Sequence, residues 1–167
     1  TAELCRSLGS RVERRGNVLE LETPSVINTK VASLSRPNRI PILALGPLLA
    51  RVGEAELPLL GGDRIGPRPV NFHLDALKAM GAVIEDGDHS YRARAPHGLY
   101  GARIRFSYPS VGATENVILA AVRAQGRTVI ENAATEPEVM ALIKMLQNMG
   151  AIIGLGPNRM VYKEGVP

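Results

Sequence analysis

The sequence predicts a mixed α/β (α+β) protein that is built from a repeated unit. Three segments of the 167-residue chain share one pattern, in which a helix-like end is followed by a glycine and then by a β-rich run. The glycines are Gly9, Gly81 and Gly150, and they recur at intervals of 72 and 69 residues. The second and third copies also match upstream, where an apolar helix ends at Gly53 or Gly126 and a strand follows. Self-similarity at a fixed spacing is typical of repeat architectures.

The composition predicts one globular domain in the cytoplasm. Hydrophobic residues make up 45% and charged residues 22% of the chain, with no apolar run long enough to span a bilayer and no signal peptide at the start. Cys5 is the single cysteine, which fits a reducing compartment. The net charge of +4 favours anionic partners, but the chain has four Tyr, two Phe and no Trp to stack on bases. We therefore expect neither a nucleic-acid nor a membrane partner.

The chain opens with part of a unit. Residues 1–21 predict the end of a helix and a hairpin around residues 14–17. Cys5 has the position that Leu77 and Leu146 hold in the other copies, so it is expected in the core. Relative to their glycine, the matched copies begin about 40 residues earlier than this one does, so Thr1 is expected to lie inside a unit whose beginning is missing.

The second unit begins with residues 25–36, which fit a short strand and a loop. Residues 38–52 have apolar side chains at helical spacing, but Gly46 and Pro47 should kink or break that helix. Arg39 stands at its start, either solvated or placed to meet an anion that a helix N-terminus attracts.

The same unit continues with a strand at residues 55–59, a helix at 70–80 and a hairpin at 83–95. His89 and His97 fall in or beside turns. No further ligand recurs at metal spacing, so no metal site is expected.

The third unit opens with a strand at residues 102–106, where apolar residues alternate with arginine. Residues 107–114 then turn through Ser and Gly into a helix expected at 115–124. Such a turn presents N–H groups to an anion such as phosphate, although an ordinary capped helix uses the same residues. After a strand at 128–131, residues 135–138 fit a capping box with proline in the first turn of a helix that runs to Met149.

The connection between the strand at 55–59 and the helix at 70–80 is five residues longer than its counterpart in the third unit. It is rich in Gly and Pro and contains Asp63, Arg64 and Arg68. A carboxylate beside two guanidiniums is suited to holding phosphate and moving a proton, so we interpret this stretch as an active-site loop. The alternative is a solvated turn in which Asp63 pairs with an arginine.

Three stretches together carry a resemblance to a known family. They are Gly61-Gly62-Asp63-Arg64-Ile65-Gly66-Pro67-Arg68-Pro69-Val70, Ser110-Val111-Gly112-Ala113-Thr114-Glu115-Asn116 and Val129-Ile130-Glu131-Asn132-Ala133-Ala134-Thr135-Glu136-Pro137-Glu138. The chain resembles, over essentially its whole length, the UDP-N-acetylglucosamine enolpyruvyl transferases (1-carboxyvinyltransferases) of the EPSP synthase superfamily.

The resemblance implies an inside-out α/β barrel of pseudo-threefold βαβαββ repeats, with helices inside and sheets outside. Residues 1–167 would form one domain that carries the catalytic loop, with its first repeat truncated, its second at about 25–97 and its third at about 98–167. The second domain of the enzyme would be absent.

The resemblance also implies a reaction and its residues. The family transfers the enolpyruvyl group of phosphoenolpyruvate to the 3-hydroxyl of UDP-N-acetylglucosamine and releases phosphate, the first committed step of peptidoglycan synthesis, without a cofactor. Asp63 stands where the family usually has the cysteine acid, as in its fosfomycin-insensitive members. The residues expected along the substrates are Arg39, Arg68, Pro69, Val70, Asn71, Phe72, Tyr108, Pro109, Ser110, Val111 and Gly112.

Two of these residues depart from the family pattern. Tyr108 replaces a common lysine, and Asn71 replaces an aspartate that contacts uracil. Two other functions remain open at this point: an EPSP synthase that acts on shikimate 3-phosphate, and a non-catalytic relative that serves as an interaction module.

Overall fold

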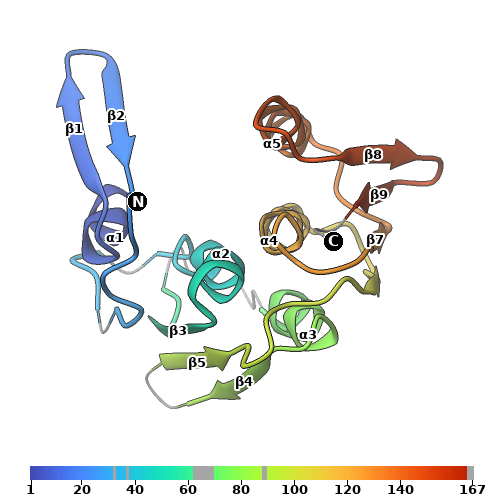
Figure 1. Cartoon of the computed structure of the whole chain (residues 1–167), viewed down its shortest axis with the longest axis horizontal. Coiled ribbons are helices and arrows are strands. Elements are labelled where there is room, and N and C mark those ends of the chain that lie inside the picture. The colour runs from blue at the N-terminus through green and yellow to red at the C-terminus, as the bar shows by residue number, and fades with distance from the viewer. Residues whose placement is uncertain (32, 37, 62–69, 88–89, 165–167) are drawn as a thin grey trace.

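The computed structural model describes residues 1–31, 33–36, 38–61, 70–87 and 90–164. Three small sheets lie apart around the outside, with α2 and α4 between them (Figure 1). The elements in chain order are α1 (Ala2–Ser7), β1 (Arg11–Arg15), β2 (Val18–Glu22), α2 (Ile42–Val52), β3 (Glu54–Pro58), α3 (Asn71–Ala79), β4 (Val83–Asp86), β5 (Ser90–Arg94), β6 (Arg103–Arg105), α4 (Val111–Ala121), β7 (Thr128–Glu131), α5 (Pro137–Asn148), β8 (Ile153–Gly156) and β9 (Met160–Lys163).

The third unit has the order β6, α4, β7, α5, β8, β9 and forms one four-stranded sheet. Its strand order is β6-β7-β9-β8; β6 runs parallel to β7, and the other pairs are antiparallel. Buried Ile104 and Ile130 face the helices from this sheet, while Arg103 and Arg105 point outward. The alternation explains why so short a strand was visible in the sequence.

The second unit repeats this topology. Its sheet order is β3-β5-β4, and a parallel bridge joins Lys30 to Glu56 where the third unit has β6 beside β7. Glu56 donates from its backbone N to Thr29 O at 2.7 Å and accepts from Val31 N at 2.8 Å. The short strand expected within residues 25–36 is thus reduced to this bridge, and both units follow the order βαβαββ.

The glycine stops recur as backbone geometry. The N–H groups of Ser10, Ala82 and Ala151 each donate to the carbonyl five residues earlier, at 2.9, 3.0 and 2.9 Å. The glycine before each donor has a φ of 107°, 96° or 98°, in the left-handed region that L side chains rarely adopt. Each helix therefore ends in the same way and is followed by an antiparallel hairpin, as the spacing of the glycines predicts.

Gly46 and Pro47 were predicted to kink or break the helix of residues 38–52; the helix is not broken, and α2 begins only at Ile42. Its Gly46 N–H donates to Asn116 Oδ1 at 3.1 Å, and Asn116 Nδ2 donates to Ile42 O at 3.1 Å. Those two backbone groups are the pair that an α-helix joins directly. The Asn116 carboxamide from α4 thus supports α2 just before Pro47.

Several boundaries and roles expected from the sequence are wrong. The helix predicted from residue 115 begins at Val111, because Ser110 Oγ caps it by accepting from Ala113 N at 3.4 Å. The capping box does not form: Glu136 is the N-cap of α5 and has no side-chain cap hydrogen bond, although Pro137 does open the helix. Cys5 is only half-buried, and Leu4 takes the core position in α1.

Candidate functional site

The first turns of α2 and α3 meet at the N-terminal half of α4. Ile42 opens α2, His73 is the third residue of α3, and both hydrogen-bond to Asn116 in α4. Each of these helices follows a segment that leaves the carboxyl end of a strand or bridge. The first N–H groups of α2, those of Ile42, Leu43 and Ala44, are bonded to the carbonyls of Arg39, Ile40 and Pro41. The donors that suit an anion at this junction therefore come from the starts of α3 and α4.

The start of α4 has the clearest anion-binding geometry. Ser110 Oγ accepts from Ala113 N, and Thr114 N donates to Ser110 O at 2.9 Å. The N–H groups of Val111 and Gly112 donate to no other residue in the described part of the chain. They supply two free donors at the positive end of an 11-residue helix.

An aromatic contact links the start of α3 to the loop before α4. The centroid of the Phe72 ring lies 5.0 Å from that of the Tyr108 ring, in an edge arrangement, and 5.7 Å from that of the Phe106 ring. Phe106 is buried, whereas Tyr108 is 58% exposed. The exposed Tyr108 face is therefore held at the site by its neighbours and is available for stacking.

His73 is a buried polar residue at this junction, with 7% of its surface exposed. Its Nδ1 lies 3.2 Å from Asn116 Nδ2. The Asn116 amide is oriented by backbone groups that can only donate (Gly46 N) or only accept (Ile42 O), so its Nδ2 is the donor to His73. Nδ1 must then accept, which puts the imidazole proton on Nε2.

The environment keeps His73 uncharged. Burial, together with the positive charge of half-buried Arg39, lowers the pKa of His73 from 6.5 to about 4. The Nε2 edge of the ring faces the first turn of α4: a Cβ added to Gly112 would lie 3.3 Å from His73 Cε1 and 3.5 Å from Nε2. Glycine at this position lets the ring approach the helix start closely.

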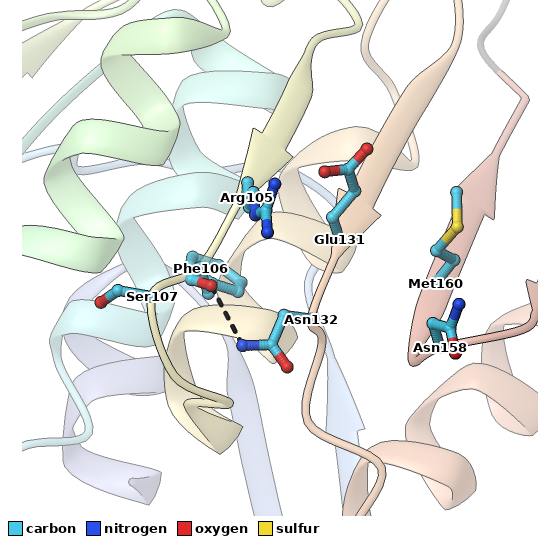
Figure 2. Close-up of a pocket in the computed structure, with 7 residues that line it drawn as sticks. All are labelled: Arg105, Phe106, Ser107, Glu131, Asn132, Asn158 and Met160. Carbon is cyan, nitrogen blue, oxygen red and sulfur yellow. Dashed lines mark hydrogen bonds between the residues drawn. The ribbon is translucent and has the colours of Figure 1, made fainter.

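A polar pocket of about 560 Å³ lies beside the loop that leads to Tyr108. Figure 2 shows Arg105, Phe106 and Ser107 on one wall and Asn158 and Met160 on the other. Asn132 donates to Phe106 O at 3.1 Å and so fixes the end of β6 against the end of β7. Since Arg105 points away from the helices, this pocket opens on the outer side of the sheet.

The structure brings together part of the predicted site. Val70 is the N-cap of α3, Asn71 and Phe72 lie in its first turn, and the 108–112 residues lead into α4. Arg39 lies just before α2. Asp63, Arg64, Arg68 and Pro69, and also His89, lie outside the described residues.

Sequence reasoning missed His73 and Asn116. Asn116 is a polar residue followed by Val117, Ile118 and Leu119 in a helix, and a buried amide in such a run signals a specific hydrogen-bonding role. No comparable signal marked His73. Within the described ranges no group of three or more His, Cys, Asp or Glu could hold a metal ion, and no helix is long and apolar enough to cross a bilayer.

The fold and the site define a class of protein. The model of the EPSP synthase (3-phosphoshikimate 1-carboxyvinyltransferase) family matches residues 1–167, and the chain belongs to this family. Among solved structures, the enolpyruvyl transferase NikO from Streptomyces tendae is similar with a TM-score of 0.77 and 19% identity, over 98% of this chain and 39% of that one. EPSP synthase from Acinetobacter baumannii is similar with a TM-score of 0.67 and 18% identity, over 97% of this chain and 37% of that one. These likenesses show the mixed α/β fold.

Two curated relatives share one protein name within this family. UDP-N-acetylglucosamine 1-carboxyvinyltransferase of Chlamydia abortus is 52% identical over 165 residues, which cover 96% of this chain and 37% of the relative. The protein of the same name from Sulfurovum is 44% identical, over 99% of this chain and 40% of the relative. The family resemblance is thus confirmed, and the chain spans about two fifths of the length of these relatives.

Proposed function

We propose that this chain is the loop-bearing domain of an enzyme that transfers the enolpyruvyl group of phosphoenolpyruvate to the 3-hydroxyl of UDP-N-acetylglucosamine. The observation that carries the proposal is the 52% identity to a relative named for this activity, over 96% of the chain. The neighbouring starts of α3 and α4 support it, because a diphosphate and a phosphate both need N–H donors. In a bacterium the product would enter peptidoglycan synthesis.

The reaction proceeds by addition and elimination. A proton added to the methylene carbon of phosphoenolpyruvate makes C2 electrophilic, and the sugar oxygen forms a bond to C2 as its own proton leaves to a base. In the resulting ketal the bond between C2 and the phosphate oxygen then breaks, phosphate leaves with the electron pair, and a methyl proton departs to a base to restore the double bond, while the new bond to the sugar oxygen remains. We assign the proton donation to Asp63 and the binding of phosphate or carboxylate to Arg68.

The nucleotide would lie along the starts of α3 and α4. Val111 and Gly112 offer N–H groups to the diphosphate, and the exposed Tyr108 ring, supported by Phe72, offers a face to the base. With Tyr108 in place of lysine and Asn71 in place of aspartate, base binding in this protein would depend on stacking and neutral hydrogen bonds instead of charges.

The architecture fits a barrel that this chain only partly supplies. The second and third βαβαββ units, residues 25–97 and 98–167, would be two thirds of a pseudo-threefold domain with helices inside. The beginning of the first unit and a second domain would come from further chain in the full-length protein, where the base for the sugar hydroxyl would also lie. Closure of two domains would exclude water from the ketal.

The test is phosphate release by the full-length protein from phosphoenolpyruvate, with UDP-N-acetylglucosamine or shikimate 3-phosphate as acceptor. Turnover that depends on the UDP-sugar supports the proposal. Turnover with shikimate 3-phosphate alone would assign the EPSP synthase reaction instead. Failure of both, together with failure to complement a strain that lacks the transferase, would leave the non-catalytic relative.

A further inference from the structure

We propose that His73 is a further substrate-binding residue, which donates a hydrogen bond from Nε2 to a phosphate oxygen held at the start of α4, and that Asn116 fixes the tautomer that makes this possible. This inference rests on the proposed function for the identity of the ligand, a nucleoside diphosphate. The contact itself follows from the geometry of α2, α3 and α4.

The hydrogen bonds around Asn116 each have a defined direction. Gly46 N–H has only a proton to give and Ile42 C=O has only lone pairs, so the amide can be seated in one way. Its Nδ2 then faces His73 Nδ1 at 3.2 Å as a donor. A proton on Nδ1 would oppose that donor, so the proton stays on Nε2.

The Nε2 atom of His73 points toward the start of α4. His73 is more than nine tenths buried, and no hydrogen bond from its Nε2 is found among the described residues, although Nε2 is not one of the fully buried atoms that lack a partner there. It faces Gly112, the second residue of α4, where an added Cβ would lie 3.5 Å from Nε2 and, more tightly, 3.3 Å from Cε1. The Nε2–H group and the free N–H groups of Val111 and Gly112 are therefore close together at one helix start.

The charge and the number of these donors suit an anion. Arg39 is the charged neighbour that acts on His73, and its positive sign favours an anion at this position. A neutral imidazole adds a donor without adding a charge that would have to be desolvated. A phosphate oxygen, with several lone pairs, is the acceptor that can meet three such donors at once.

The same amide also couples the ligand to α2. Asn116 contacts Ile42, the first residue of α2, and Arg39 lies three residues before it. A ligand bound to His73 is therefore connected, through the Asn116 side chain, to the segment that carries Arg39.

The experiment uses the full-length protein with two substitutions that separate the ring nitrogens. His73→Asn keeps an oxygen near Nδ1 to accept from Asn116 but loses the distal donor, and His73→Gln keeps an amide donor near Nε2. His97→Asn, in an exposed turn, is the matched control. Binding of inorganic pyrophosphate, UDP and uridine is measured by calorimetry, and the protonated ring nitrogen is identified by ¹⁵N NMR of labelled histidine.

We expect His73→Asn to weaken pyrophosphate and UDP about tenfold, as the loss of one hydrogen bond to a charged group does, with uridine unaffected. His73→Gln should lose less than His73→Asn, and His97→Asn should match the parent. The NMR signal of His73 should show a bare Nδ1, and its Nε2–H should shift on addition of pyrophosphate.

Three results would overturn the inference: a proton on Nδ1, unchanged pyrophosphate binding by His73→Asn, or a parent protein that binds neither pyrophosphate nor UDP. If the parent binds pyrophosphate but not UDP and His73→Asn still weakens it, the contact stands and the proposed nucleotide substrate fails.

Discussion

Replacing Gly46 by alanine sets two physical effects against each other. Glycine inside a helix costs about 1 kcal/mol relative to alanine, so helix propensity alone predicts that Gly46→Ala stabilises α2. The structure predicts the reverse. A Cβ at this position would lie 2.6 Å from Asn116 Oδ1, 2.8 Å from Asn116 O and 3.0 Å from Ala120 Cβ, closer than real Cβ contacts.

The magnitudes decide in favour of the packing effect. Overpacking a core costs about 1–3 kcal/mol, and the displaced Asn116 amide would leave Gly46 N–H buried without its partner, at about 1–3 kcal/mol more. After subtracting about 1 kcal/mol for propensity, the net loss in the free energy of unfolding is about 3 kcal/mol.

Urea unfolding of the parent and the variant measures this difference. Ala50→Gly, a half-buried position in the same helix, is the control for propensity and should lose about 1 kcal/mol. In an Asn116→Ala background the penalty of Gly46→Ala should shrink, because the nearest atom has been removed. A Gly46→Ala protein as stable as its parent would refute the assigned contact between α2 and α4.

Other predictions concern the site. The free energy of unfolding should fall by up to about 3 kcal/mol as the pH drops from 6.5 to about 4, because the unfolded chain protonates His73 in that range and the folded chain does not; urea unfolding at several pH values, with His73→Asn as the variant that flattens the curve, measures it. The full-length protein should resist covalent modification by fosfomycin, whereas Asp63→Cys should gain it, since a thiolate opens the epoxide far faster than a carboxylate; equal labelling at this loop in mass spectrometry would contradict the role of Asp63. Tyr108→Ala should weaken UDP binding by about 1–3 kcal/mol through lost stacking, and calorimetry that finds no change would exclude Tyr108 as the base platform. The 167-residue chain alone should fold but release no phosphate from the two substrates, and sustained turnover by it would show that no further chain is needed.

The sequence predicted those parts of the fold that are local in the chain. The glycine stops, the hairpins and the strand at residues 128–131 all follow from short patterns, and the structure has them where they were expected. Some failures are local, such as the start of α4 at Val111 and the missing capping box of α5. Others involve partners far away in sequence. Continuity of α2 depends on Asn116, 70 residues beyond Gly46, and no window around residues 42–52 contains that information.

The same limit applies to the candidate site. Helix starts and arginines can be recognised from local signals, so Ser110 and Arg39 were identified as candidates before the fold was known. His73 could not be, because its role depends on which of its two nitrogens carries the proton, and the neighbour that sets this lies on another helix.

The two complete units show how the fold separates support from chemistry. The strands of the two units pair in the same order, so the sheets do not distinguish one unit from the other. The differences lie in the connections that precede the helices: the one before α3 is longer and carries the proposed acid, and the one before α4 ends at a capped helix start. Asn116, in α4, accepts from Gly46 N, donates to Ile42 O and lies 3.2 Å from His73 Nδ1, and so joins α4 to the starts of α2 and α3. Under the proposed function, a phosphate at the start of α4 would meet donors whose positions are fixed in advance, and such preorganisation is what makes hydrogen bonds effective at a charge that develops during reaction.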